Sequence, residues 1–130
     1  MKIVVGYDGS NAGRDALILA VKHAKAFGAE VSVIRSMEGG GREDAEAIRT
    51  AQRDLAYAQE RFDREGVTCE THLLVRGLSP GEDIVKFAQD NGADEIIIGV
   101  RRRSRVGKAL FGSASQYVIL EAPCPVVSIK

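Results

Sequence analysis

The residues best suited to chemistry lie in one segment near the end of the chain, from Asp94 to Ser115. An apolar run there, Ile96 to Ile98, ends at Gly99 and is followed by a loop with four arginines and one lysine within eight residues. Gly112-Ser113 then opens a helical pattern. Because helix starts leave backbone N–H groups unpaired and carry partial positive charge, this order of features suits an anion, most often a phosphate. The segment therefore predicts a nucleotide-phosphate site.

A solvated surface loop is the alternative, and the local sequence does not exclude it. Glycine marks strand ends and loops in all kinds of proteins, and an arginine-rich turn is often only exposed to water. A glycine-spaced loop is a weak motif without a strand before it and a helix after it. The hypothesis therefore depends on the elements that would position the loop.

Length and composition predict one domain, residues 1–130. The chain has 130 residues, of which 45% are hydrophobic, enough for a sizeable single core. Lysine plus arginine equals aspartate plus glutamate at 18 each, so no overall field attracts nucleic acid or an anionic membrane. No apolar run approaches the roughly 20 residues that span a bilayer, and the first residues do not resemble a signal peptide. We expect a cytoplasmic protein without membrane or nucleic-acid partners.

Strands and helices are predicted to alternate along the chain. The expected strands cover residues 2–7, 30–37, 67–75, 96–98 and 126–129. The expected helices cover residues 12–27, 43–64, about 80–91 and 113–121. This order predicts an α/β fold, an open five-stranded parallel sheet of Rossmann-like type with helices on both faces. In such sheets ligands bind beyond the carboxyl ends of the strands, where Asp8, Ser36, Gly99 and the basic loop are expected.

The pattern offers no evident catalytic or metal-binding residues. His23 lies between lysines in a predicted helix and is expected on its solvent face. Glu82 and Asp83 fall at a predicted helix start, where the helix dipole accounts for them without catalysis. Cys69 and Cys124 lack the spacing of a metal site or a redox motif, so both are expected in the core.

Segments along the whole chain resemble the universal stress protein family. They are YDGS after the first strand, GLSPGEDIV after the third, IIIG before the basic loop, FGSAS at the last helix start and PCPVVSIK at the end. The resemblance implies a fold of the adenine nucleotide alpha-hydrolase-like type. It also implies a stress-response regulator that binds ATP, or another adenine nucleotide, together with Mg²⁺.

Carried over position by position, the resemblance implies two groups of nucleotide-binding residues. Those expected beside the adenine and ribose are Gly6, Tyr7, Asp8, Ser36, Ile98 and Gly99. Those expected on the phosphates are Arg101, Arg102, Gly112, Ser113, Ala114 and Ser115. For Asp8 an Asx turn or helix cap is an equally good interpretation of the local sequence, and for Ser113 a simple N-cap is the alternative.

The loop departs from the family's signature at one position. The signature is glycine, two residues, glycine, nine residues, then glycine and a small hydroxyl residue; Gly99 and Gly112-Ser113 match, but Arg102 replaces the middle glycine. Arginine cannot adopt positive φ as cheaply as glycine, yet its guanidinium can bind phosphate directly. If Arg102 clamps the phosphates, Arg102→Gly loses binding; if Arg102 blocks the site, the same variant binds more tightly.

Several functions follow from these features. The first is a nucleotide-binding regulator in which binding itself is the switch. The alternatives are a very slow ATP hydrolase and an interaction module of the same fold that no longer binds nucleotide. The last strand, Val126 to Ile129, is apolar and expected at a sheet edge, which invites pairing with a second copy. The family's usual dimer resembles this arrangement, so we expect a homodimer through that strand.

Overall fold

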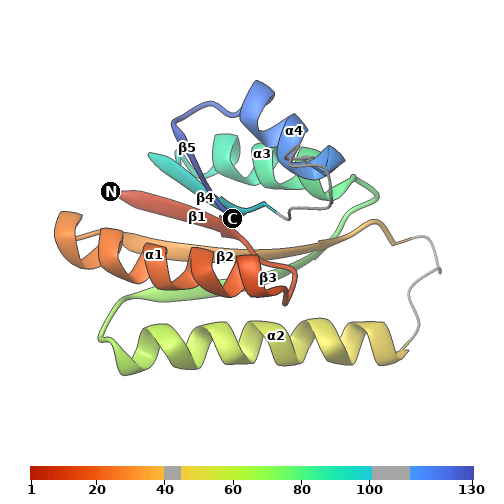
Figure 1. Cartoon of the computed structure of the whole chain (residues 1–130). Helices are drawn as coiled ribbons and strands as arrows, with labels where there is room; N and C mark the ends of the chain where they lie inside the picture. Colours follow the sequence, from red (N-terminus) through yellow and green to blue (C-terminus); the bar gives the residue numbers. More distant parts are fainter. Residues whose placement is uncertain (40–44, 101–111) are drawn as a thin grey trace, which may run out of the picture.

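The computed structural model describes residues 1–39, 45–100 and 112–130. Its strands are β1 (Lys2–Gly6), β2 (Glu30–Met37), β3 (Cys69–Val75), β4 (Glu95–Gly99) and β5 (Val126–Ile129). Its helices are α1 (Asn11–Phe27), α2 (Ala45–Arg64), α3 (Pro80–Asp90) and α4 (Ser113–Glu121). Figure 1 shows three layers, with α1 and α2 on one face of the sheet and α3 and α4 on the other. The predicted α/β class is confirmed, with element bounds within two residues of those expected for the described part of the chain.

The five strands form a single parallel sheet in the order β3-β2-β1-β4-β5. The chain starts at the central strand, moves outward through β2 and β3, and then crosses to β4 and β5 on the other side. The strand order therefore reverses between β1 and β4. At such a reversal the loops leave in opposite directions, and a crevice opens beyond the carboxyl ends of the strands. We call this side of the sheet the carboxyl edge.

The central strands are buried on both faces, which explains their unbroken apolar sequences. On β1, Ile3 and Val5 pack with α1 and α2, whereas Val4 packs with α3 and α4. On β4, Ile97 faces the first pair of helices and Ile96 faces the second. Each residue in these runs therefore contributes to one of two cores, one on each side of the sheet.

Side-chain caps fix where two of the helices begin. Ser10 Oγ accepts a hydrogen bond from the Gly13 N–H at 3.1 Å, which starts α1 as the sequence predicts. Ser79 and Glu82 form a capping box at the start of α3, and Pro80 occupies its first turn. These caps set the direction in which each helix leaves the carboxyl edge.

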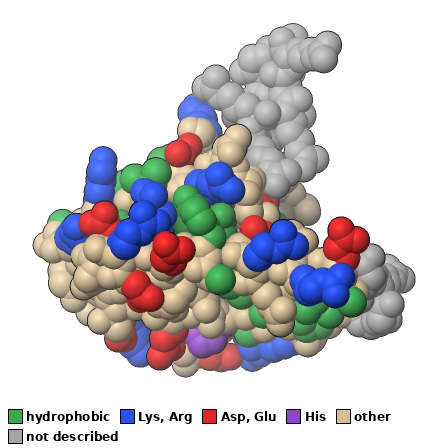
Figure 2. Space-filling model, turned by 90° about the horizontal axis from the view of Figure 1, so that it is seen from below, with side chains coloured by type: hydrophobic (Ala, Val, Ile, Leu, Met, Phe, Trp, Pro, Cys, Tyr) green, Lys and Arg blue, Asp and Glu red, His purple; other side chains and the backbone are tan. Residues whose placement is uncertain are grey.

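The surface formed by α1 and α2 carries side chains of both charges. Figure 2 shows Lys and Arg interspersed with Asp and Glu over this face. His23 belongs to α1, but its Nδ1 lies 2.6 Å from Glu95 Oε1 on β4 and its side chain is only 26% exposed. The predicted solvent-facing position of His23 is therefore wrong, because its ring turns towards the carboxylate of Glu95 and away from solvent. None of the described helices combines the length and apolar composition needed to cross a bilayer.

The two cysteines are half-buried and lie on opposite sides of the sheet. Cys69 packs against the core beneath α1 and α2, and Cys124 packs against the core beneath α3 and α4. Burial raises the pKa of the Cys69 thiol to about 12, with the carboxylates of Asp63 and Glu70 adding to the effect. Cys69 therefore remains a neutral thiol at physiological pH.

Candidate functional site

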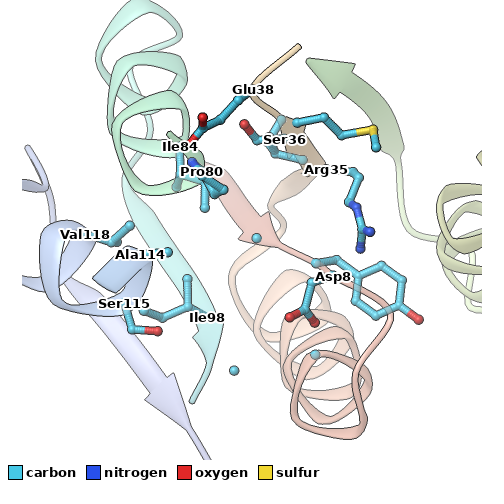
Figure 3. Close-up of a pocket in the computed structure, with 16 residues that line it drawn as sticks. Asp8, Arg35, Ser36, Glu38, Pro80, Ile84, Ile98, Ala114, Ser115 and Val118 are labelled. Carbon is cyan, nitrogen blue, oxygen red and sulfur yellow. The ribbon is translucent and has the colours of Figure 1, made fainter. Parts of the chain in front are cut away.

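A pocket of about 490 Å³ opens at the carboxyl edge. It lies between the ends of β1, β2 and β4 and the first turns of α3 and α4 (Figure 3). Its volume falls in the range of small-molecule sites, and its position is the crevice where the strand order reverses. The pocket is therefore a suitable place for a small-molecule ligand.

Most of the predicted site residues line this one pocket. They are Gly6, Tyr7, Asp8, Ser36, Ile98, Gly99, Ala114 and Ser115. Gly112 and Ser113 lie next to it, exposed at the start of α4, but they are not part of its lining. Arg101 and Arg102 lie outside the described residues. The structure thus brings together residues separated by more than 100 positions in the sequence.

Two glycines line the pocket where neighbouring atoms lie close, and at Gly99 those atoms are backbone. A Cβ on Gly99 would lie 2.5 Å from the backbone carbonyl carbon and oxygen of Ala12, and 2.7 Å from Gly13 N. A Cβ on Gly6 would lie 2.8 Å from Ile84 Cδ1. The end of β4 therefore rests directly on the first turn of α1. Gly99 is required for this close approach and not for an unusual backbone angle.

The start of α4 leaves backbone donors beside the pocket. Its N-cap residue, Gly112, has extended backbone angles of φ −62° and ψ 159° and makes no side-chain cap hydrogen bond. By contrast, Ser10 and Ser79 cap α1 and α3 with their hydroxyl groups. Ala114 and Ser115, in the first turn of α4, line the pocket. An anion in the pocket would therefore meet backbone N–H groups that the N-cap side chain does not occupy.

A buried carboxylate supports the opposite side of the pocket. Asp83 is 0% exposed, and its Oδ2 accepts a hydrogen bond of 2.7 Å from Ser36 Oγ, while its Oδ1 accepts one of 2.7 Å from Arg76 Nε. Arg76 also forms an ion pair with Asp83 through Nη2. Asp83 lies in the first turn of α3 as predicted, but the helix dipole alone does not account for it, because its side chain is fully buried and paired with Arg76.

A signal for this burial was present in the sequence. Pro80, Ile84 and Phe87 recur at helical spacing and mark the face of α3 that packs inward. Asp83 falls on the same stripe, and a charged residue among core positions is found buried only with a partner. Arg76 and Ser36 are the partners of Asp83, but nothing in the sequence pattern links either residue to it.

Tyr7, at the end of β1, lies in a wall of the pocket where two arginines approach side chains of α2. Tyr7 is buried, and this burial raises the pKa of its phenol, although a hydrogen bond with Arg14 acts in the opposite direction. The guanidinium of Arg14 lies 5.0 Å from the ring centroid of Tyr57. Arg35 also lines the pocket, and its Nη1 lies 3.7 Å from Asp54 Oδ2 on α2. Tyr7 therefore offers a neutral ring to the pocket, and the two arginines lie close to Tyr57 and Asp54 of α2.

The whole chain matches a known family. The model of the Universal stress protein family matches residues 1–130. A universal stress protein from Thermus aquaticus, in the QAH/OAS sulfhydrylase 3′ region, is 35% identical and is aligned over 98% of this chain and 97% of its own length. Among solved structures, a universal stress protein from Archaeoglobus fulgidus superimposes with a TM-score of 0.93 at 44% identity, covering 100% of this chain and 98% of that one.

A second solved structure carries a ligand. It is the universal stress protein from Archaeoglobus fulgidus in complex with dAMP, with a TM-score of 0.87 and 40% identity, and it covers 100% of this chain and 98% of that one. These similarities extend from end to end, so they concern the complete fold and not a single motif.

Proposed function

This chain belongs to the universal stress protein family, and on that basis we propose that it binds an adenine nucleotide in the pocket at the carboxyl edge. The main support for the proposal is that one pocket of about 490 Å³ combines two different kinds of surface. One end is apolar, and the other is a helix start whose N-cap residue makes no side-chain cap hydrogen bond. The dAMP complex of the relative from Archaeoglobus fulgidus, 40% identical, supports the same ligand class.

The two ends of the pocket suggest how a nucleotide would lie. Met37, Pro80 and Ile84 form the end between β2 and α3, and their apolar side chains suit the faces of a purine. The end at α4 presents the first turn of that helix, including Ala114 and Ser115, and suits a phosphate. Figure 3 shows Pro80 and Ile84 with Ser36 and Glu38 on one side and Ala114 and Ser115 of α4 on the other. We therefore propose that the base lies towards Ser36 and the phosphates towards Ser115.

We propose ATP with Mg²⁺ as the physiological ligand and its binding as a regulatory switch. Among the described residues there is no cluster of three or more His, Cys, Asp or Glu side chains that could hold a metal ion. A Mg²⁺ ion would accordingly arrive with the nucleotide and be held mainly by phosphate oxygens, as is usual for this ion. Arg101 and Arg102 would add charge-assisted contacts to the phosphates.

Isothermal titration of the nucleotide-free protein tests this function. We expect micromolar binding of AMP and of Mg-ATP, with GTP much weaker. Thermal melting provides a second readout, because a ligand at 100 times its Kd stabilises the folded state by about 2.7 kcal/mol. No heat and no shift in Tm at millimolar nucleotide would contradict the proposal and favour an interaction module on the same scaffold.

The homodimer is a separate prediction based on β5. This strand is an edge of the sheet, and α4 beside it exposes Tyr117, Ile119 and Leu120, the last at 77%. An apolar edge of this kind is normally covered by a partner. Light scattering at micromolar concentration is expected to give twice the chain mass of 14.0 kDa, whereas a mass of 14.0 kDa would contradict the dimer.

Ser128→Pro provides the matched variant for this interface. The amides of Ile96 and Val100 donate to the carbonyls of Pro125 and Ile129, so the peptide groups of these odd-numbered residues face β4. Since the direction alternates along a strand, the Ser128 N–H faces the open edge. Proline there removes a donor that a second copy would use and leaves the β4 ladder intact. We expect the variant to shift towards the monomer while remaining folded.

A further inference from the structure

We propose that Ser36 and Asp83 make the pocket select a base that carries an exocyclic amino group over one that carries a carbonyl group at the same position. The inference rests on the proposed function, since it concerns how that nucleotide is recognised. Ser36 is the specificity-determining residue because it lines the pocket, and Asp83 is a positioning residue that acts through it.

The hydrogen bonds around Asp83 restrict the orientation of its carboxylate. The carboxylate is 0% exposed and receives Ser36 Oγ at 2.7 Å on Oδ2 and Arg76 Nε at 2.7 Å on Oδ1. The Asp83 carbonyl oxygen of the backbone also accepts from Arg76 Nη2 at 3.4 Å. A guanidinium donates only, so Arg76 holds Oδ1 as an acceptor and fixes the plane of the carboxylate. Asp83 Oδ2 is thereby aimed at the hydroxyl of Ser36.

This arrangement determines what Ser36 offers to a ligand. A serine hydroxyl has one proton to donate and two lone pairs with which to accept. In Ser36 the proton is donated to a carboxylate that can only accept, and it is not available to the pocket. What remains towards the pocket is an acceptor. A ligand group that meets Ser36 Oγ must therefore be a donor.

Purine bases differ in whether their exocyclic group donates or accepts a hydrogen bond. Adenine carries an amino group, which donates, where hypoxanthine and guanine carry a carbonyl oxygen, which accepts. Met37, Pro80 and Ile84 line the pocket near Ser36, so a carbonyl placed there would lose its hydrogen bond to water without gaining another. Glu38 also lines this end, but it is exposed and remains accessible to water. The fixed hydroxyl of Ser36 is accordingly the stronger source of selection.

The test compares AMP with IMP, which has the carbonyl group in place of the amino group. Binding of each nucleotide is measured by isothermal titration on the full chain. The wild-type protein is expected to prefer AMP by about tenfold, the size of effect that follows from one matched against one unmatched buried hydrogen bond. Ser36→Ala removes the oriented acceptor, and the preference should fall to about twofold or less.

Asp83→Asn gives the sharper result because it should reverse the hydrogen bond. Arg76 keeps an oxygen at the position of Oδ1, so the amide nitrogen takes the position of Oδ2 and donates to Ser36 Oγ. The serine proton is then released towards the pocket, where it can meet a carbonyl group. We expect this variant to bind IMP more tightly than AMP, an inversion that a merely structural role of Asp83 does not produce.

Two further variants complete the experiment. Asp90→Asn makes the same chemical change on the same helix at a side chain 53% exposed and paired with Lys86, and it should retain the wild-type preference. Glu38→Gln tests the other carboxylate at this end of the pocket. Thermal melting confirms that each variant is folded.

The outcomes separate the inference from the function on which it rests. Equal affinity of the wild type for AMP and IMP would overturn the inference while leaving nucleotide binding intact. The inference would also be overturned if Glu38→Gln changed the preference for AMP over IMP while Ser36→Ala and Asp83→Asn left it unchanged. Failure of the wild type to bind either nucleotide would instead contradict the proposed function itself. Loss of preference in Ser36→Ala with inversion in Asp83→Asn would establish the selection.

Discussion

Gly99→Ala is expected to destabilise the protein by about 3 kcal/mol, the upper end of the cost of overfilling a packed interior. The added Cβ would lie 2.5 Å from the backbone carbonyl of Ala12, and a backbone atom cannot rotate out of the way. Either β4 or the first turn of α1 must therefore move. Since both border the pocket, we expect nucleotide affinity to fall together with stability.

Urea denaturation of the two proteins measures this effect, and Gly112→Ala is its control. A Cβ on Gly112 would have none of the described residues within 4 Å, and its φ of −62° is accessible to alanine. The control should lose less than about 1 kcal/mol, the difference between glycine and alanine as an N-cap. Equal stability of the wild type and Gly99→Ala would show that β4 does not rest on α1 as described.

Ser115→Asp is expected to weaken AMP binding by about 100-fold while slightly raising Tm. Ser115 lies in the first turn of α4 and lines the pocket. A carboxylate there interacts favourably with the helix dipole, by about 0.5 kcal/mol. Each negative charge on a phosphate at a separation of about 6 Å would be repelled by about 3 kcal/mol if the effective dielectric constant is about 20, and one such charge already accounts for the loss in affinity.

The opposite signs of the two effects make this variant informative. A mutation that merely damages the fold lowers stability and binding together, whereas this one should separate them. Ser115→Asn is the matched neutral change and should reduce affinity by no more than about tenfold. If Ser115→Asp bound AMP as well as the wild type, the phosphates would have to lie away from the start of α4.

The fold could be predicted from the sequence because its signals are local. The runs in β1 and β4 are apolar without alternation, which is typical of strands buried on both faces. Ser10 and Ser79 each precede a helical pattern and each proves to be a cap. Gly28 closes α1 in the left-handed conformation that favours glycine, with φ of 64°. Such features depend on a few neighbouring residues.

The polar support of the pocket could not be predicted in the same way. Asp83 is buried because Arg76 and Ser36 approach it, and Ser36 comes from a strand 47 residues earlier in the chain. His23 turns inward because of Glu95, which is 72 residues away in sequence. Both contacts depend on how β2 and β4 are placed beside the helices. Periodicity indicates which face of a helix is apolar, but it does not indicate which distant partner a charged group will meet.

The pocket could be predicted only in part. A parallel sheet predicts a site at its carboxyl edge, and the strand-end residues Asp8, Ser36 and Gly99 do line one pocket. The second layer of that pocket, from Pro80 and Ile84, depends on α3 packing across β2 and was not anticipated. The phosphate-binding role of Arg101 and Arg102 remains a prediction.

A crystal structure of the protein grown with AMP would test the central claim most directly. We predict density for the nucleotide in the pocket at the carboxyl edge, with its amino group within hydrogen-bonding distance of Ser36 Oγ and its phosphate on the backbone N–H groups at the start of α4. A fully occupied nucleotide bound elsewhere on the chain, or an empty pocket at saturating AMP, would contradict the account.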